Sequence, residues 1–284
     1  MTRKSRMYGS SGLAAALLAF AMLTFAPSHA RSAGLLDEAK ARGELLLGTE
    51  LQFAPFEFLI DNKPTGYSID LMNLVAADLG VKIHVQDLPF ASVLPGLDAK
   101  KYDLVEATST ITKARMERYY FTLPIMDATV ALVKRKGDTS IMKPADIAGK
   151  VVGGTKGSAQ TKVLRDYVET LPGGVQEVKE YIGSPNAYAD LQAGRIAAVA
   201  GSLPNLAYLV KTRPDTFELV RPAFGPQAYL AWLARKDDAS KQLIDAVDAS
   251  LVKLTKSGKV KALQLKWFGV AVDLPIDQVP APLY

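Results

Sequence analysis

From residue 44 onward, short apolar runs alternate along this chain with stretches in which apolar residues recur every three or four positions. Short apolar runs, such as 45–47, are typical of strands in a parallel sheet that is covered on both faces. Stretches between them, such as 68–79, place Leu71, Val75 and Leu79 on one helical face, with Ser68 as the predicted N-cap. This alternation predicts βαβ units and an α/β fold. The predicted strands are 44–49, 81–85, 102–107, 129–133, 151–152, 175–178, 196–200 and 229–233, and the predicted helices are 35–42, 68–79, 90–100, 159–168, 186–192, 203–211, 239–255 and 258–268.

The first 30 residues have a different pattern. Arg3, Lys4 and Arg6 precede an apolar run at 12–25, and Ser-His-Ala at 28–30 supplies small residues where a signal peptidase reads the chain. The apolar run is too short to span a bilayer comfortably, which disfavours the alternative of a retained membrane anchor. We therefore expect residues 1–30 to be a cleavable signal peptide and the protein to be exported.

Removal of that segment changes the charge balance. Without its three basic residues the formal net charge falls from +5 to about +2, and no run of lysines or arginines remains, so we expect no nucleic-acid partner. The chain has no cysteine, which excludes disulfides, thiolate chemistry and Cys-ligated zinc. Beyond the segment one histidine is left, His84, and no cluster of metal ligands, so we expect no metal and no cofactor.

The most informative stretch is 102–115. An apolar strand breaks there into hydroxyl residues, among them Thr108 and Thr110, and a helix of about two turns carrying Arg115 follows. The first N–H groups of a helix have no internal partner, and an arginine can grip a carboxylate through two hydrogen bonds. The junction is therefore suited to an anion, although a capped helix with a surface arginine explains the same pattern.

A glycine-rich turn at 153–158, Gly-Gly-Thr-Lys-Gly-Ser, also precedes a predicted helix. The residue order of a P-loop and the spacing of a dinucleotide-binding turn are both absent. Ser158 is instead placed to cap the helix, whose free N–H groups offer a second anion site.

The stretch 102–115 resembles the Asp-x-x-x-x-(Gly/Ser)-x-Thr-x-Thr-x-x-Arg segment of the periplasmic solute-binding proteins that serve polar amino-acid ABC transporters, the bacterial extracellular solute-binding proteins of family 3. Similar segments occur in family order from residue 43 to 269. They are Gly48-Thr-Glu-Leu-Gln-Phe-Ala-Pro-Phe-Glu-Phe58, Gly66-Tyr-Ser-Ile-Asp-Leu71, Gly157-Ser158, Gly194-Arg195 and Lys266-Trp-Phe-Gly269.

This resemblance implies a two-lobed periplasmic binding protein of type II, with a mostly parallel sheet and flanking helices in each lobe and a two-strand hinge. Lobe 1 would comprise 31–128 and 225–284, and lobe 2 would comprise 129–224. The implied function is the substrate-binding component of an ABC importer, which captures an amino acid or related carboxylate between closing lobes and delivers it to the membrane permease. A monomer in the periplasm is expected.

The resemblance also implies a site built from both lobes. Phe53 and Phe90 flank the aliphatic part of the ligand, with core packing as the alternative for Phe53. In relatives that bind basic amino acids, the position of Glu50 contacts the cationic side chain of the ligand. The expected contacts of the ligand carboxylate are Thr108, Thr110 and Arg115 from lobe 1 and Ser158, Ala159 and Gln160 from lobe 2.

One position departs from the family. Where relatives have an aspartate that takes the ligand α-ammonium, this chain has Ser202. An ammonium without a counter-charge is costly to desolvate, so either the ligand lacks a standard α-ammonium or another carboxylate has replaced the aspartate. Glu106 occupies a usually apolar position and is a candidate, although it could also reach water at the strand end. We expect a small carboxylate ligand that bears a cationic or polar nitrogen.

Two other classes of function stay open. Some relatives of this fold are exported dehydratases, and two acids can converge in space for acid–base work without any sequence signal. A sensory ligand-binding module is the second. A membrane sensor needs a further apolar segment of about 20 residues, and none follows residue 30, so a free binding protein is favoured.

Overall fold

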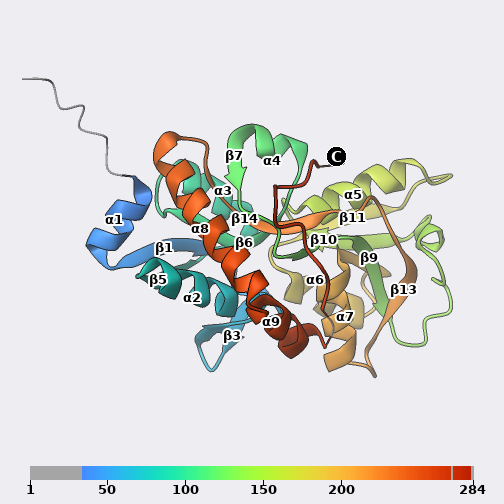
Figure 1. Cartoon of the computed structure of the whole chain (residues 1–284). Helices are drawn as coiled ribbons and strands as arrows, with labels where there is room; N and C mark the ends of the chain where they lie inside the picture. The colour runs from blue at the N-terminus through green and yellow to red at the C-terminus, as the bar shows by residue number, and fades with distance from the viewer. Residues whose placement is uncertain (1–33, 270, 283–284) are drawn as a thin grey trace, which may run out of the picture. The chain divides into compact units, whose positions relative to one another are not determined.

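Two β-sheets organise the chain (Figure 1). The structure, a computed structural model, describes residues 34–269 and 271–282; the predicted signal peptide, 1–30, lies outside them. All elements below belong to one compact unit, 33–284.

The first sheet has the strand order β5-β1-β6-β14-β7, and β8 pairs with β14. β5, β1 and β6 are parallel, whereas β14 is antiparallel to β6, β7 and β8, so the sheet is mixed. Alternate side chains of each strand enter two separate cores, one on each face. The strands are β1 (Glu44–Thr49), β5 (Lys82–Asp87), β6 (Leu104–Thr110), β7 (Tyr119–Phe121), β8 (Met126–Asp127) and β14 (Tyr229–Arg235).

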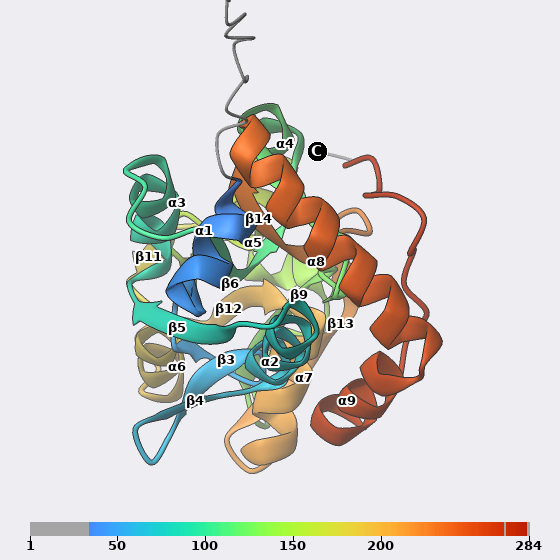
Figure 2. The same cartoon turned by 60° about the vertical axis from the view of Figure 1, so that its left-hand side comes forward.

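Helices cover both faces of this sheet (Figure 2). On one face, Leu45, Leu47 and Trp232 pack with residues of α1, α2, α8 and α9; on the other, Val105 packs with residues of α3. The helices are α1 (Leu35–Arg42), α2 (Tyr67–Leu79), α3 (Phe90–Asp98), α4 (Lys113–Arg118), α8 (Asp238–Lys256) and α9 (Lys259–Phe268). A small antiparallel sheet, β2 (Gln52–Phe53), β3 (Glu57–Ile60) and β4 (Lys63–Thr65), lies between β1 and α2 in the chain.

The second sheet has the order β11-β10-β12-β9-β13. β11, β10 and β12 are parallel, and β9 is antiparallel to both of its neighbours. α5 packs on one face, and α6 and α7 pack on the other. The elements are β9 (Val130–Arg135), a 3₁₀ turn η1 (Pro144–Ile147), β10 (Val151–Thr155), α5 (Ala159–Glu169), β11 (Glu177–Tyr181), α6 (Ser184–Gln192), β12 (Ala198–Ser202), α7 (Leu203–Thr212) and β13 (Phe217–Phe224).

The chain passes between the two sheets twice. It leaves the first sheet after β8 and enters the second at β9, then leaves the second after β13 and returns at β14. The strands on either side of these crossings run against their neighbours in both sheets. That is why the sheets are mixed, whereas βαβ alternation alone predicted mostly parallel ones.

The α/β prediction is confirmed, and each predicted helix and strand is present with ends displaced by a few residues. The short strands β2, β3, β4, β7 and β8, of two to four residues each, were not predicted. β13 was missed because it carries Pro222 and a register shift between Val220 and Phe224, which an edge strand tolerates. The predicted cap of α2 is wrong: the helix begins at Tyr67, and Gly66 is the N-cap. Gly66 has φ 127°, and a Cβ there would lie 2.1 Å from the Phe56 carbonyl oxygen.

None of the helices within the described residues is both long and apolar enough to cross a membrane.

Candidate functional site

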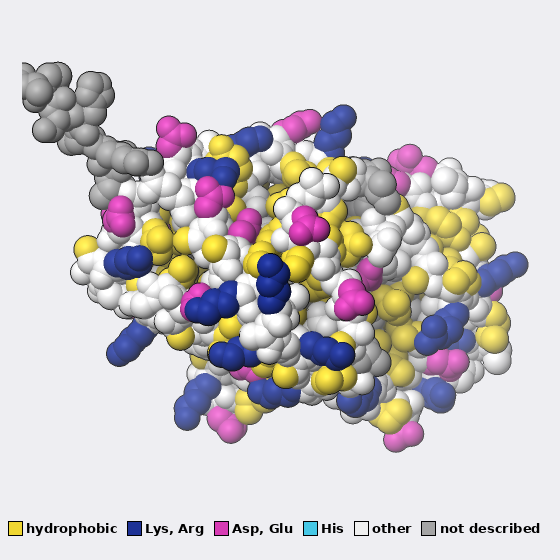
Figure 3. Space-filling model, in the orientation of Figure 1, with side chains coloured by type: hydrophobic (Ala, Val, Ile, Leu, Met, Phe, Trp, Pro, Cys, Tyr) yellow, Lys and Arg dark blue, Asp and Glu magenta, His cyan; other side chains and the backbone are white. Residues whose placement is uncertain are grey.

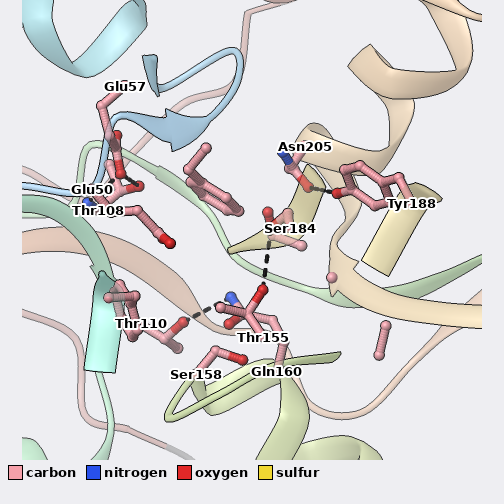
Figure 4. A pocket seen from close by; sticks show the side chains of 15 residues that line it. Glu50, Glu57, Thr108, Thr110, Thr155, Ser158, Gln160, Ser184, Tyr188 and Asn205 are labelled. Atoms are coloured by element: carbon pink, nitrogen blue, oxygen red, sulfur yellow. Dashed lines mark hydrogen bonds between the residues drawn. The ribbon is translucent and has the colours of Figure 1, made fainter. Parts of the chain in front are cut away.

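A polar cavity lies where strand ends of the first sheet face helix starts of the second (Figure 4). Its space, open solvent included, is about 480 Å³. The side of the first sheet contributes Glu50, Phe53, Glu57, Phe90, Thr108 and Thr110. The side of the second sheet contributes Thr155, Ser158, Gln160, Ser184, Tyr188, Ala200, Gly201, Ser202 and Asn205.

The strand ends bring these residues together. Glu50 directly follows β1, and Ser202 is the last residue of β12. Thr108 and Thr110 are among the last three residues of β6. The carboxyl ends of parallel strands meet at one edge of a sheet, which is where open α/β sheets bind ligands. The same logic places Thr155, at the end of β10, beside Ser184 at the start of α6, with 3.2 Å between their hydroxyl oxygens.

Eight of the ten residues predicted for the site line this cavity: Glu50, Phe53, Phe90, Thr108, Thr110, Ser158, Gln160 and Ser202. Phe53 also stacks on Phe56, 5.4 Å between ring centroids, so the pocket and packing alternatives for Phe53 both hold in part. Ala159, the first residue of α5, is buried but does not line the cavity. Nothing in these positions tests ligand contact, and their roles stay predictions.

Arg115 lies next to the cavity rather than in its lining. Its guanidinium donates to the Thr110 carbonyl oxygen at 3.1 Å and to the Gly157 carbonyl oxygen at 3.2 Å. The same group lies over the Phe90 ring, 5.5 Å from the centroid. Arg115 thus contacts one residue of each predicted anion site.

The predicted cap of α5 is present. The Ser158 hydroxyl oxygen accepts from the Thr161 N–H at 3.1 Å. Next to it, the Gln160 side-chain amide donates to the Thr110 hydroxyl at 3.1 Å, so the helix start is tied to the end of β6 (Figure 4). On the other side of the cavity, the Tyr188 hydroxyl donates to the side-chain oxygen Oδ1 of Asn205 at 2.8 Å, and the side-chain amide of Asn205 donates to the backbone carbonyl of Ala54.

Glu57 is a site residue that the sequence prediction missed. Only 1 % of it is exposed, and its Oε1 accepts from both the N–H and the hydroxyl of Thr108, each at 2.8 Å. Its Oε2 has no partner among the described residues. Burial, then the charge of Glu106, raises the pKa of Glu57 well above its ordinary value. The signal available in the sequence is an acid between two aromatics, Phe56 and Phe58, in a short strand.

Glu50 is the second acid of the cavity. It is 3 % exposed, and its Oε1 is also without a partner among the described residues. Burial raises the pKa of Glu50 to about 7, against a bond from the Phe90 backbone N–H that lowers it.

Glu106 does not reach water, so that alternative for its side chain is wrong. It is fully buried behind the lining: the Thr49 hydroxyl donates to its Oε2 at 2.7 Å, and its Oε1 contacts the Ser68 hydroxyl. Burial raises the pKa of Glu106 to about 7. The reason is its position in β6, the middle strand of the sheet, where both faces are covered.

Ser202 faces the cavity with a fully buried hydroxyl that has no partner in the described part of the chain. Three polar oxygens around the cavity, one each on Glu50, Glu57 and Ser202, therefore lack a hydrogen-bond partner. Buried polar groups are rarely left unsatisfied, so a ligand with hydrogen-bond donors fits this cavity. No group of three or more His, Cys, Asp or Glu among residues 34–269 and 271–282 is arranged to hold a metal ion.

Two sheets linked by two chain crossings, with a polar cavity between their facing ends, define a solute-binding protein of the two-lobed periplasmic type. The chain belongs to the bacterial extracellular solute-binding proteins, family 3, whose family model matches residues 45–270. It is similar to the L-cystine-binding protein TcyJ of Escherichia coli (strain K12), with 32% identity over 241 residues that cover 84% of this chain and 88% of that protein.

Solved structures agree on the fold. An ancestral arginine-binding protein bound to arginine is 32% identical, with a TM-score of 0.74 and coverage of 80% of this chain and 99% of that one. The ancestral amino acid-binding protein AncCDT-1, described as a precursor of cyclohexadienyl dehydratase, is 27% identical, with a TM-score of 0.75 and coverage of 82% and 99%. The predicted family and the type II fold class are confirmed.

Proposed function

We propose that this chain is the periplasmic substrate-binding component of an ABC importer. It captures a small amino acid, or a related carboxylate with a cationic nitrogen, between two lobes that close around the ligand. The lobes are 31–128 with 225–284, and 129–224. After removal of the signal peptide, 1–30, the protein acts as a monomer and delivers its ligand to a permease in the inner membrane.

The observation that carries the proposal is the distribution of charge around the cavity. Two nearly buried acids, Glu50 and Glu57, each present an oxygen without a partner, and none of the ion pairs of the described residues involves them. Buried acids without a basic partner are unfavourable unless a cation or proton accompanies them. A ligand nitrogen supplies that positive charge.

The residues around Arg115 are suited to bind the carboxylate end of the ligand. Its guanidinium, the Thr110 hydroxyl and the start of α5 converge on one edge of the cavity. A fixed cation and a helix N-terminus both favour a carboxylate. An amino acid carries both of these charges.

A nucleic-acid partner has no support in the charge pattern. On the face that Figure 3 shows, Lys and Arg side chains are interspersed with Asp and Glu and form no continuous basic field. The relatives named above as binding proteins also support a small-molecule ligand.

A thermal-shift screen tests the function. We expect at least one standard or derivatised amino acid to stabilise the mature protein by about 2.7 kcal/mol at 100 times its Kd, which corresponds to roughly 5–10 °C in a protein of this size. Succinate and putrescine, which each carry one kind of charge, serve as controls and should stabilise little. The proposal fails if no amino acid, opine or derivative stabilises the protein, or if succinate stabilises it as strongly.

A dehydratase activity is the second candidate, because two acids of the site have raised pKa values, as acid–base catalysis requires. The same samples decide between the two functions. After prolonged incubation with excess protein, a binding protein returns the stabilising compound unchanged by mass spectrometry, whereas a dehydratase yields a product 18 Da lighter.

A further inference from the structure

Three buried carboxyl groups form a cluster beside the cavity. Glu50, Glu57 and Glu106 are 3 %, 1 % and 0 % exposed and come from the end of β1, from β3 and from β6. Only the first two line the cavity; Glu106 lies behind it. Three negative charges in such a place repel one another strongly, because little water screens them.

Glu57, the first residue of β3, lies against the face of β6 that carries Glu106. Glu57 accepts both hydrogen bonds of Thr108, and Thr108 is two residues from Glu106 in the same strand. Side chains two apart in a strand point to the same face. Glu50, directly after β1, is the other titratable group whose charge acts on the pair. Asp87 at the end of β5 and Tyr188 on α6 lie in turn near Glu50. On the neighbouring α4, Arg115 bonds the carbonyl of Thr110.

The hydrogen bonds around Glu106 contain a place for a proton. The Ser68 hydroxyl accepts from the Trp232 indole N–H at 2.9 Å; it closely contacts Oε1 of Glu106 and lies 3.4 Å from the Glu106 carbonyl oxygen. A hydroxyl has one hydrogen and cannot donate to both. If Oε1 of Glu106 carries a proton, it donates to Ser68, and Ser68 donates to the carbonyl, so every contact is satisfied.

We propose that Glu57 and Glu106 hold one proton between them while the cavity contains no cation, and that a ligand cation seated at the free Oε2 of Glu57 releases this proton to solvent. The inference rests on the proposed function, since it needs a cationic ligand in this cavity. The O–H bond of one carboxyl breaks, the proton passes to water or buffer, and nothing is oxidised or reduced. Like charges sharing a buried site bind a proton in this way in other carboxyl pairs.

The exchange of a proton for a ligand cation makes affinity depend on pH. Burial raises the pKa of Glu106 to about 7 and that of Glu57 well above its ordinary value, so the empty site is protonated near pH 6. Because the bound state holds fewer protons, affinity for a cationic ligand should rise with pH. The expected rise is roughly tenfold per pH unit between about pH 5 and 6.5, and it levels off above about pH 7.

Isothermal titration calorimetry at pH 6.0 in two buffers of different ionisation enthalpy counts the released protons. We would use L-arginine first and, if it does not bind, the strongest binder of the thermal-shift screen that has no pKa between 4.5 and 7.5. About one proton, or more if Glu50 also ionises, should be released per ligand bound. Binding without proton release overturns this inference and leaves the proposed function intact. Absence of binding by every compound overturns both.

Matched variants identify the source of the proton. Glu106→Gln keeps an amide that can bond Ser68 and Thr49, and should reduce the release by about one proton and flatten the pH dependence of Kd. Asp248→Asn is the control: burial raises the pKa of this acid to about 6, but it lies on α8 and bonds the Leu123 N–H, outside the cavity. Equal release by wild type and Glu106→Gln contradicts the proposal. Should Glu106→Gln not fold, the pH dependence of Kd of the wild type decides: a Kd that stays constant between pH 5 and pH 7 contradicts the proposal.

Discussion

At the scale of single residues, Arg115 has the clearest proposed role. Its guanidinium is held on its own side of the cavity by the Thr110 carbonyl and the Phe90 ring, so it is oriented before a ligand arrives; in the closed arrangement it also donates to the Gly157 carbonyl. A side chain fixed in this way loses little conformational freedom on binding. This explains how an arginine at the edge of the cavity can serve as the carboxylate contact.

Replacement of Arg115 tests that role. Loss of a desolvated charged partner costs about 2–5 kcal/mol, so Arg115→Ala should abolish micromolar binding in calorimetry. Arg115→Lys should restore it only in part, because an ammonium lacks the planar fork of the guanidinium. Arg118→Ala is the control, since Arg118 belongs to the same helix but pairs with Asp98 at the surface. Binding by Arg115→Ala within threefold of wild type would contradict the assignment.

Ser202 shows how a departure from the family pattern is accommodated. Its hydroxyl is buried at the end of β12 and offers no charge to an ammonium. The acids of the site lie instead on the side of the first sheet, at Glu50 and Glu57. The negative charge that the ligand needs is therefore supplied, in our proposal, from the opposite wall of the cavity.

At the scale of elements, β1, β3 and β6 bring three acids into one buried cluster, and this must affect stability. An acid whose pKa is raised in the folded state binds more protons there than in the unfolded chain. Its contribution is favourable below the unfolded pKa, near 4.5, and is lost as pH rises through about 7. Asp248, with a pKa raised to about 6, acts in the same direction.

The ligand-free protein should therefore lose stability between pH 5 and pH 7. Each acid could contribute about 2 kcal/mol, and the sum is smaller because the three titrations are coupled. Chemical denaturation at the two pH values measures the difference. Glu106→Gln should weaken the pH dependence, whereas replacement of the exposed Glu38 on α1 by Gln should not. Stability that is constant or rises from pH 5 to pH 7 would argue against a buried, proton-binding cluster.

At the scale of the whole molecule, hydrogen bonds across the cavity describe a closed arrangement. Gln160 on α5 bonds Thr110 on β6, Arg115 on α4 bonds Gly157, and Asn205 on α7 bonds Ala54. Within the described residues, the chain crosses between the sheets at 128–129 and at 225–228. Such a pair of crossings can serve as a hinge.

Closure on ligand binding follows from the two-sided lining. A ligand that contacts both sides has a higher affinity for the closed state and shifts the population towards it. Small-angle scattering should show a smaller radius of gyration at saturating ligand than without it. Gln160→Ala, which removes one bridge, should favour the open form and enlarge the ligand-dependent change. An unchanged radius, with binding confirmed by calorimetry, would mean that the ligand contacts one side only or that the free protein is already closed.

The sequence by itself determined the features that depend on neighbours within a few residues. The alternating periods predicted the α/β fold, the helices and the longer strands other than β13, and the hydroxyl-rich junction and the Ser158 cap were both found where the pattern indicated them. These features are local, because helix caps and strand ends are set by residues three or four positions apart. The family resemblance added the lining residues that lie at strand ends, including Glu50 and Ser202.

Only the tertiary structure decided which polar side chains are buried together. Glu57 is 51 positions from Thr108 in the chain, and Ser68 bonds Trp232 across 164 positions. No local pattern encodes such pairs, so Glu57 and Asn205 were missed and Ser68 was misread as a helix cap. The environment of Glu106 likewise depends on α2 and β14, which close over it. Burial and charge pairing are long-range properties, and they turn a row of strand ends into a cavity lined by buried acids.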